Sequence, residues 1–166
     1  MIKFHSLDNV YFTSDTHFNH NKILENRAYN NLDEMNNDIV KIWNNTVNHN
    51  DIVFHLGDFS FYNANHLSML NGRKILVIGN HDNRKIKNNS SWESVRHYIE
   101  IKSDDKLLCL MHYPIENWNL KEHGSIHLHG HCHGNLSHTS KHLVNRHDVG
   151  WDVYKKPVQL STIVGK

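Results

Sequence analysis

Side chains able to bind a divalent metal ion recur along the chain, and most of them follow directly on a short apolar segment. They are Asp15, His17, Asp58, Asn80, His81, His112, His131 and His133. Carboxylate, amide and imidazole donors in this mixture suit Mn, Fe or Zn, and the lack of cysteine among them argues against a structural zinc site. Two ions about 3.5 to 4 Å apart need a carboxylate able to bridge them. Asp58 is the natural candidate, because it lies between the two ligand groups in the sequence.

The spacing of these residues is consistent with a shared site. Asp15 and His17, and likewise His131 and His133, are two residues apart. On extended backbone this spacing directs both side chains of a pair to the same face. A glycine precedes several ligand groups, at places where a sharp turn or a close backbone approach is easiest without a Cβ. These glycines are Gly57, Gly79 and Gly130.

The elements that must position these groups can be read from the apolar pattern. Strands are expected at residues 10–14, 51–56 and 74–78, each ending just before a ligand group. Apolar residues at three- and four-residue spacing predict an amphipathic helix over residues 33–47 with Asp33 as its N-cap, and residues 65–70 predict a short helix. Further strands are expected at residues 97–101, 107–111, 125–129 and 158–164.

Strands that alternate with helices early in the chain and dominate later predict an α/β (α+β) fold. We expect an αββα sandwich of two packed mixed β-sheets flanked by helices, with the junctions between strands and polar loops gathered at one edge. The 166 residues fit a single domain over residues 1–166.

Composition limits the class of protein. With 38% apolar and 21% charged residues, the chain is typical of a folded, water-soluble protein. Its 18 basic and 17 acidic side chains leave a formal charge of +1. This balance gives no support for a broad nucleic-acid-binding surface, so a charged substrate must be bound locally. We expect cytoplasmic localisation and no membrane partner, because there is no long apolar run and the two cysteines are too few for a disulfide framework.

The ligand groups form an ordered set of motifs. In sequence order the motifs are Asp15-x-His17, Gly57-Asp58, Gly79-Asn80-His81-Asp82, His112 and Gly130-His131-x-His133. Each follows an expected strand, and together they resemble the calcineurin-like metallophosphoesterase superfamily, in particular its small single-domain bacterial and phage branch. The chain departs from that pattern at Asn19, where the branch more often has glycine. It also departs at residues 59–61, which lack an Asp that some branches place there. Both departures bear on substrate fit and not on a ligand.

The resemblance implies a site for two divalent transition-metal ions, Mn above all, with Fe, Zn or Ni compatible with the same donors. The first ion would be bound by Asp15, His17, Asp58 and His133. The second would be bound by Asp58, Asn80, His112 and His131, so that Asp58 bridges the two. His81 would assist the leaving group, and Asp82 would orient or charge His81. A metal-bridging hydroxide would attack phosphorus in line, in a phosphodiester more than in a phosphomonoester.

Other side chains near the motifs are weaker candidates. His20 follows the first motif closely and, like Asn80, is a candidate for contact with a small phosphoester or nucleotide-type substrate. A base-stacking or phosphate-binding pocket has as its candidates Arg27, Arg84, Asn117 and Trp118, although tryptophan more often lies in a core. Of the remaining histidines near the motifs, His127 and His129 are expected to be strand residues satisfied by their neighbours. His55 is expected to be a residue of a core strand.

Two alternatives stay open. Residues 127–133 suggest a metallo-β-lactamase type of site, but they lack the acidic residue and adjoining histidine that follow the paired histidines in that motif. A non-catalytic, metal-dependent binding scaffold of the same fold is the alternative of a different class. Retention of His81 and Asp82 argues against the scaffold, because a scaffold needs no acid for a leaving group.

Overall fold

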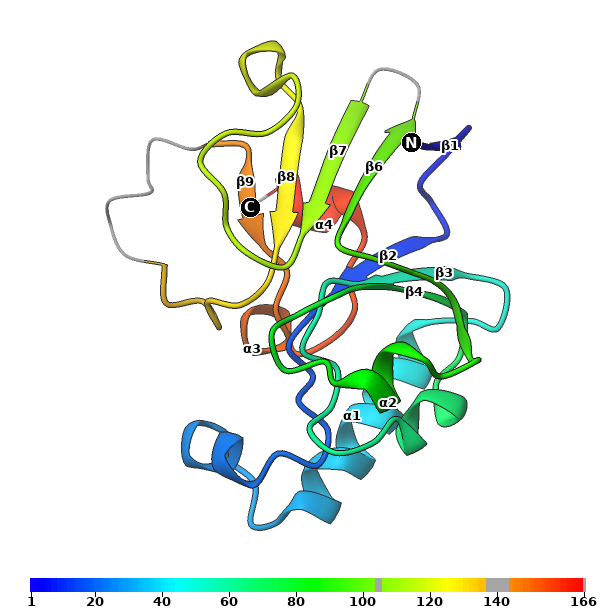
Figure 1. The fold of residues 1–166 in the computed structure, drawn as a ribbon, viewed down its shortest axis with the longest axis vertical. Helices are drawn as coiled ribbons and strands as arrows, with labels where there is room; N and C mark the ends of the chain where they lie inside the picture. The colour runs from blue at the N-terminus through cyan, green and yellow to red at the C-terminus, as the bar shows by residue number, and fades with distance from the viewer. Residues whose placement is uncertain (104–105, 137–143, 166) are drawn as a thin grey trace.

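Two β-sheets lie against each other in the computed structural model, which describes residues 1–103, 106–136 and 144–165 (Figure 1). The four-stranded sheet is entirely parallel and has the order β2-β3-β4-β5. Its strands are β2 (Val10–Thr13), β3 (Ile52–His55), β4 (Arg73–Val77) and β5 (Trp92–Arg96). The register pairs Thr13 with His55 and His55 with Leu76, so β2, β3 and β4 end level with one another.

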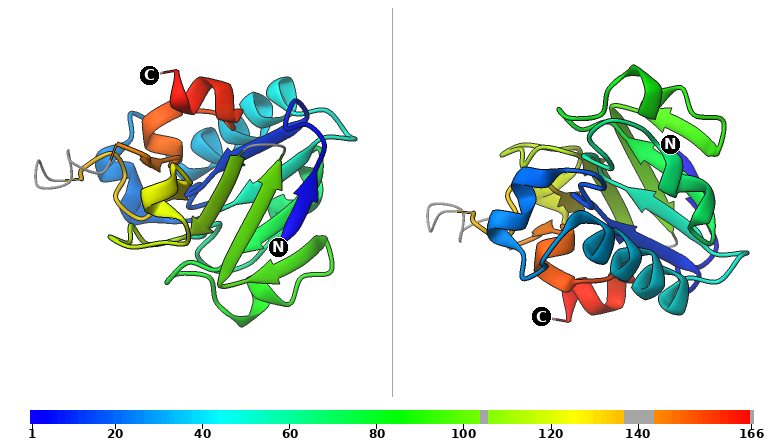
Figure 2. Two further views of the ribbon diagram at one scale, coloured as in Figure 1. Left: turned by 90° about the horizontal axis from the view of Figure 1, so that it is seen from above. Right: turned by 90° about the horizontal axis from the view of Figure 1, so that it is seen from below.

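The second sheet is mixed and has the order β1-β6-β7-β8-β9. Its strands are β1 (Ile2–Phe4), β6 (Tyr98–Ser103), β7 (Lys106–Met111), β8 (Ile126–His129) and β9 (Arg146–Asp148). Only the β6–β7 pair is antiparallel among these described strands. Figure 2 shows β1, β6 and β7 side by side from above.

Apolar side chains from the facing surfaces of the two sheets form one core. Phe12, Phe54 and Val77 from the four-stranded sheet share this core with Leu108 and Leu128 from the five-stranded sheet, and all five are buried. Burial of this area is the main source of stability for the sandwich.

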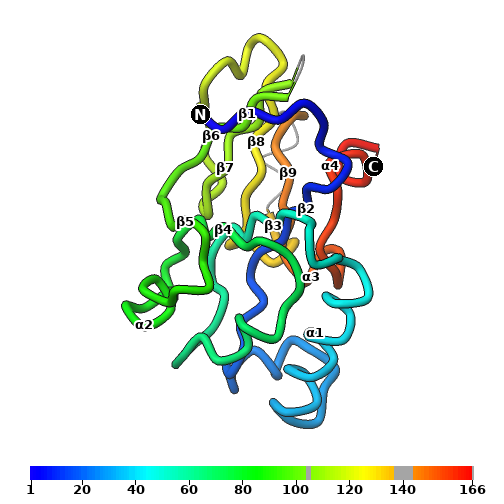
Figure 3. Tube along the Cα trace, turned by 90° about the vertical axis from the view of Figure 1, so that its right-hand side faces the viewer, coloured from blue at the N-terminus to red at the C-terminus, as the bar shows by residue number. Residues whose placement is uncertain are grey.

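A helical layer covers the other face of the four-stranded sheet, away from the five-stranded sheet (Figures 1 and 3). Its main element is α1 (Leu32–Thr46), whose Met35, Ile39 and Trp43 are fully buried in a second core. The shorter η2 (Asn65–Met69) and α2 (Arg84–Lys87) complete the layer, and η1 (Asn21–Asn26) precedes it in sequence.

The start of α1 corrects the expected N-cap. Asn31, not Asp33, occupies the cap position with extended backbone, and its side-chain oxygen accepts a hydrogen bond from the backbone N–H of Glu34 at 2.9 Å. Asp33 lies in the first turn, where a negative charge interacts favourably with the helix dipole.

The outer face of the five-stranded sheet differs from the expected sandwich. In the part of the chain that the structure describes, an irregular segment from Tyr113 to Ser125 covers this face, and its only helical piece is the single turn η3 (Lys121–His123). Trp118 packs over the outward-facing His127, with ring centroids 5.3 Å apart. Two packed sheets and one helical layer agree with the prediction. The four-stranded sheet is entirely parallel and not mixed, and a second helical layer is absent from these residues.

Four strand assignments were wrong: one expected strand is absent and three strands were missed. Residues 158–164 do not form a strand: Val158 makes an isolated bridge to Phe12, and α4 (Leu160–Val164) follows. Leu160 and Ile163 are both buried three residues apart, which is helical spacing. The strands β1, β5 and β9 were missed because none of them has a continuous apolar run. The remaining helix, α3 (Trp151–Tyr154), precedes α4. Within the described residues no helix has both the length and the apolar character needed to span a bilayer.

Candidate metal-binding site

The carboxyl ends of the parallel strands bring the first ligand groups to one edge of the sheet, as is usual for binding sites in parallel α/β sheets. Asp15 follows β2 and Asp58 follows β3. The ladder continues past the strands into the two loops. The Asp15 N–H donates to the carbonyl of Gly57 at 2.9 Å, and the His17 N–H donates to the carbonyl of Asp58 at 3.1 Å. The loops that carry these ligands are therefore paired with each other.

One compact group of ligand atoms consists of Asp15, His17 and His133, whose ligand atoms all lie within 4.8 Å of one another. The Oδ1 atom of Asp15 is 3.7 Å from Nε2 of His17 and 3.7 Å from Nε2 of His133. The two imidazoles are stacked with centroids 5.1 Å apart. Ligands on different sides of one ion, each about 2.0 to 2.2 Å from it, have separations of this size.

A second compact group consists of Asp15, Asp58 and His112. Nε2 of His112 is 3.6 Å from Oδ2 of Asp58 and 3.0 Å from Oδ1 of Asn80. The same Oδ2 atom of Asp58 lies 3.8 Å from Nε2 of His17. Both carboxylates therefore lie between the two groups, and Asp15 is the residue that the compact groups share, whereas the sequence suggested Asp58 as the bridge.

The donors fit a bound cation, because several of their atoms are buried without a hydrogen-bond partner, among them Nε2 of His17, which faces the carboxylates of Asp15 and Asp58. Oδ1 of Asp15 and both ring nitrogens of His17 are buried and have no partner among the described residues. The other oxygen of each carboxylate is held by the protein: Oδ2 of Asp15 accepts from the N–H of His131 at 2.9 Å, and Oδ1 of Asp58 accepts from the N–H of His81 at 2.8 Å. Buried polar atoms without a partner are costly, and a metal ion removes that cost.

His112 gives a second indication of a cation. Its Nδ1 faces the carbonyl oxygen of Leu56 at 2.7 Å, while Nε2 faces oxygens of Asn80 and Asp58. A neutral imidazole donates from one nitrogen only. With Nδ1–H donated to Leu56, the lone pair of Nε2 meets only acceptor oxygens, an arrangement that a shared cation stabilises.

Backbone strain is concentrated at the ligands. The left-handed region, which residues other than glycine rarely occupy, contains Asp15 (φ 54°), His17 (φ 51°), Asp58 (φ 57°), His131 (φ 71°) and His133 (φ 49°). The expectation that the two-residue spacing acts through extended backbone is therefore wrong. These pairs reach one site because the loops turn sharply at each ligand, and such strain is typical of functional sites.

Two glycines are needed for the close packing of these loops. A Cβ on Gly57 would lie 2.5 Å from Nδ1 of His112 and 2.6 Å from the Cα of Gly79. A Cβ on Gly79 would overlap the carboxylate of Asp58. The loops after β3 and β4 therefore approach each other too closely for any side chain at these positions.

Asp152 is a functional residue that sequence reasoning missed. Its Oδ2 atom lies 2.7 Å from Nδ1 of His133 and accepts from Nη2 of Arg27 at 2.8 Å. Arg27 is buried and also donates to the backbone carbonyls of Asp15 and Thr16. A carboxylate that accepts the second N–H of a ligand histidine fixes its tautomer and orientation. Arg27 thus holds the ligand loop from within the protein, and this corrects its suggested role in gripping phosphate.

The pKa values around the site reflect these contacts. Burial opposes ionisation of Asp15, but its side-chain hydrogen bonds with His17 and Ser14 and its electrostatic interaction with His112 outweigh that effect and lower its pKa to about 2. The hydrogen bond between His133 and Asp152 raises the pKa of His133. Burial also opposes ionisation of Asp152, yet its bonds to His133 and Arg27 hold its pKa well below the usual range. The carboxylates of Asp15 and Asp152 are therefore both anionic at neutral pH.

The other predicted site residues lie at the same edge in different environments. His81 is 44% exposed, and its Nε2 is 3.9 Å from Oδ2 of Asp58. Asn80 is exposed and contacts His112. His131 is exposed and lies with its ring centroid 5.1 Å from that of His112, but it joins neither compact group among the described residues. His20 is half-buried beside His17, with centroids 5.2 Å apart.

Asp82 has a different role from the one expected. Its carboxylate is buried and accepts hydrogen bonds from the backbone N–H groups of Asp58, Phe59 and Gly79 at 2.8 to 2.9 Å. Burial raises its pKa, although these hydrogen bonds act in the opposite direction. Asp82 therefore braces the two ligand loops, and its hydrogen bonds do not orient His81.

The weaker candidates lie away from the ligands. His127 and His129 are buried on the outer face of β8. Both ring nitrogens of His127 face backbone carbonyls, as expected, whereas His129 has such a partner at Nδ1 only and its Nε2 has none among the described residues. Neither histidine joins the ligand groups, which gives no support to the metallo-β-lactamase alternative. Trp118 belongs to the cover of that face. Arg84 is exposed and begins α2.

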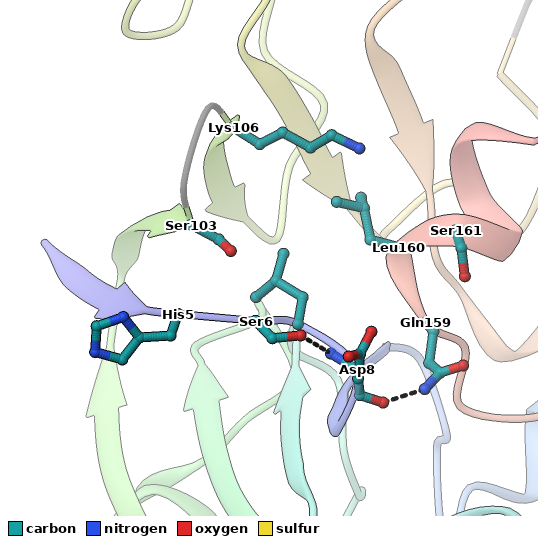
Figure 4. Close-up of a pocket in the computed structure, with 9 residues that line it drawn as sticks. His5, Ser6, Asp8, Ser103, Lys106, Gln159, Leu160 and Ser161 are labelled. Atoms are coloured by element: carbon teal, nitrogen blue, oxygen red, sulfur yellow. Dashed lines mark hydrogen bonds between the residues drawn. The ribbon is translucent and has the colours of Figure 1, made fainter.

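Cavities next to and away from the site differ in their lining. One of about 470 Å³ borders His133 and Asp152 and is also lined by Ile23 and Lys155. Another of about 290 Å³ lies between the linker after β1, the adjoining ends of β6 and β7 and the start of α4, and it contains none of the predicted ligands (Figure 4). Only the first is placed to receive part of a molecule bound at the ligands.

Fold and site together define an α/β protein with a candidate Asp/His metal-binding site at the carboxyl edge of parallel strands. The chain belongs to the same family as the Uncharacterized protein MJ1445 of Methanocaldococcus jannaschii, to which it is 35% identical over 138 residues, covering 78% of this chain and 72% of that protein. The Gene 66 proteins of Mycobacterium phages L5 and D29 are each 26% identical, over 95% of this chain and 93% and 94% of theirs. No family model matches the chain.

Two solved structures are similar in fold. The protein of unknown function AQ665 from Aquifex aeolicus has a TM-score of 0.74 and 27% identity, over 90% of this chain and 94% of that one. A conserved uncharacterized protein from Streptococcus pneumoniae, described as a predicted phosphoesterase, has a TM-score of 0.38 and 16% identity over 75% of this chain and 62% of that one, a likeness too low to carry an argument.

Proposed function

We propose that the chain is a metal-dependent phosphoesterase of the calcineurin-like metallophosphoesterase superfamily, acting on phosphodiesters more than on phosphomonoesters. The observation that supports this most is the cluster in which two buried carboxylates direct one oxygen each toward three histidines, His17, His112 and His133, from strained loops. Left-handed backbone at several ligand residues is the kind of strain that clusters at binding and catalytic sites.

Two divalent ions, Mn first among them, would be held by the groups at this edge. One would take Asp15, His17, Asp58 and His133. The other would take Asp58, Asn80, His112 and the exposed His131. Such ions activate water and neutralise the charge of phosphate oxygens.

The chain's own side chains supply the remaining steps. His81 lies beside the carboxylate of Asp58 yet keeps 44% of its side chain exposed, so it can meet a substrate held at the cluster. As an imidazolium it donates a proton to the leaving oxygen, an effect typically worth about 10² to 10⁴-fold in rate. Asp82 supports the chemistry indirectly, because it fixes the backbone that carries both Asp58 and His81.

Hydrolysis of bis(p-nitrophenyl) phosphate and p-nitrophenyl phosphate by metal-stripped protein refilled with Mn tests the proposal. Asp58→Asn should lose both metal and activity, and His81→Ala should keep its metal while kcat falls about 10² to 10⁴-fold. His123→Ala, at an exposed histidine in η3, is the matched control and should behave as the unaltered protein.

Three outcomes would count against the proposal in different ways. Activity that survives Asp58→Asn would remove the role given to that carboxylate. Inactivity toward every phosphoester, with two metals bound, would favour the binding scaffold. A higher kcat/KM for the monoester would reverse the stated preference.

Cytoplasmic localisation stays a prediction.

A further inference from the structure

One side of the candidate metal site is bordered by aromatic rings that the catalytic proposal does not use. We call His20, Phe61 and Tyr62 the aromatic rim. The rings of His20 and Phe61 are stacked, with centroids 4.3 Å apart and an interplanar angle of 0°. Tyr62 meets Phe61 edge to face at 5.0 Å and is 61% exposed. The rim therefore presents aromatic surface to solvent.

The aromatic rim lies next to the groups proposed to act on the phosphate. His20 is 5.2 Å from the ligand His17, and Phe61 is 5.8 Å from the proposed leaving-group acid His81, measured between ring centroids. His20 is itself 6.0 Å from His81. A group attached to a phosphate at the ligands has these rings within reach.

Backbone contacts hold the aromatic rim in place. The N–H of Phe61 donates to the carbonyl of Phe18 at 2.9 Å, and the side chain of Asn83 donates to the carbonyl of Phe61 at 3.0 Å. A fixed aromatic surface binds a planar group with little loss of conformational freedom. The formal charge of only +1 over the chain also leaves stacking as a better source of affinity than a basic surface.

We propose that the aromatic rim stacks the base of a nucleotide substrate, so that nucleotide phosphoesters are the substrate class of this site. The inference rests on the proposed function, because the base must be attached to a phosphate that the metal-loaded cluster binds. Stacking on aromatic side chains accepts any base, since each base has a π-face, so the rim selects nucleotides without selecting one base.

The test compares AMP with ribose 5-phosphate, which differ only in the base, by titration calorimetry on Mn-loaded protein. AMP should bind at least ~10-fold more tightly, given the usual strength of base–aromatic stacking. Tyr62→Ala and Phe61→Leu should each reduce this ratio at least ~3-fold and leave the affinity for ribose 5-phosphate unchanged. Tyr98→Ala removes an exposed tyrosine on β6 and is the matched control, and melting temperatures verify that all variants are folded.

Each other result has a distinct meaning. Equal binding of both compounds would overturn the nucleotide inference and leave the phosphoesterase proposal standing. Binding of neither would overturn the nucleotide inference, while the phosphoesterase proposal is decided separately by hydrolysis of the two p-nitrophenyl esters. A ratio that falls in Tyr113→Ala but not in the rim variants would also overturn the inference, because Tyr113 lies on the other side of the site, 4.8 Å from His131.

Discussion

Replacement of Asp152 by asparagine tests a residue that is not itself a proposed metal ligand. Asp152 contacts Nδ1 of His133 and so orients the ring whose Nε2 faces Asp15. The carboxylate lies 2.7 Å from Nδ1 of His133 and accepts from Nε and Nη2 of Arg27 at 2.9 and 2.8 Å. Asparagine has the same size but no charge, and an NH₂ group replaces one of the two acceptor oxygens, so at least one N–H donor of Arg27 or His133 then faces another donor. The hydrogen bonds that remain lose their charge assistance, which holds both His133 and Arg27 less firmly.

Two magnitudes follow for Asp152→Asn. Loss of the carboxylate that orients a ligand histidine typically lowers metal affinity about 10- to 100-fold, which is about 1.4 to 2.8 kcal/mol. The metal-free fold should also lose about 1 to 3 kcal/mol of unfolding free energy, because a buried guanidinium gives up charged hydrogen bonds. We place the loss below that of a fully buried pair, since the side chain of Asp152 is 15% exposed.

Calorimetric titration with Mn²⁺ measures the first effect, and urea unfolding in the presence of EDTA measures the second. Lys155→Met is the control: its ammonium lies 3.1 Å from the same carboxylate but is 60% exposed, so its loss should cost less than about 0.5 kcal/mol and leave metal affinity within about twofold. Unchanged metal affinity in folded Asp152→Asn protein would refute the orienting role.

Three further variants test the local arguments. Gly57→Ala should destabilise the protein by about 2 kcal/mol or more beyond the effect of Gly124→Ala. Both glycines have left-handed φ, but a Cβ at Gly124 has nothing within 4 Å, whereas a Cβ at Gly57 lies 2.5 Å from the imidazole of His112. Equal melting temperatures for the two variants would contradict this. Burial lowers the pKa of His55 to about 3, so the unfolded state takes up the proton first as pH falls below about 6.5. Stability should therefore be full above that pH and lower by about 2 kcal/mol at pH 5, and His55→Phe should remove that loss in urea titrations. Asn31→Ala should lower the free energy of unfolding by about 1 kcal/mol, and Asp33→Ala should lower it clearly less. The reverse order in denaturation midpoints would favour Asp33 as the N-cap of α1, as the sequence predicted.

The predicted strands that carry ligands agree with the structure because their signals are local. A buried strand in a parallel sheet is a continuous apolar run, and β2, β3 and β4 each have one directly before a ligand loop. The strands β5 and β9 have no such run. Trp92 alone is buried in β5, and β9 consists of arginine, histidine and aspartate. Their pairing is decided by neighbouring strands, which local sequence does not reveal.

The sequence by itself determined which side chains are candidates for a metal site and that the ends of parallel strands would bring them to one edge. Tertiary structure alone decided how they meet. The left-handed backbone at ligands such as Asp15 and His133 and the link from Arg27 through Asp152 to His133 depend on chain segments far apart in sequence. Strain of this kind persists only when surrounding contacts offset it, and those contacts form only when the chain is folded.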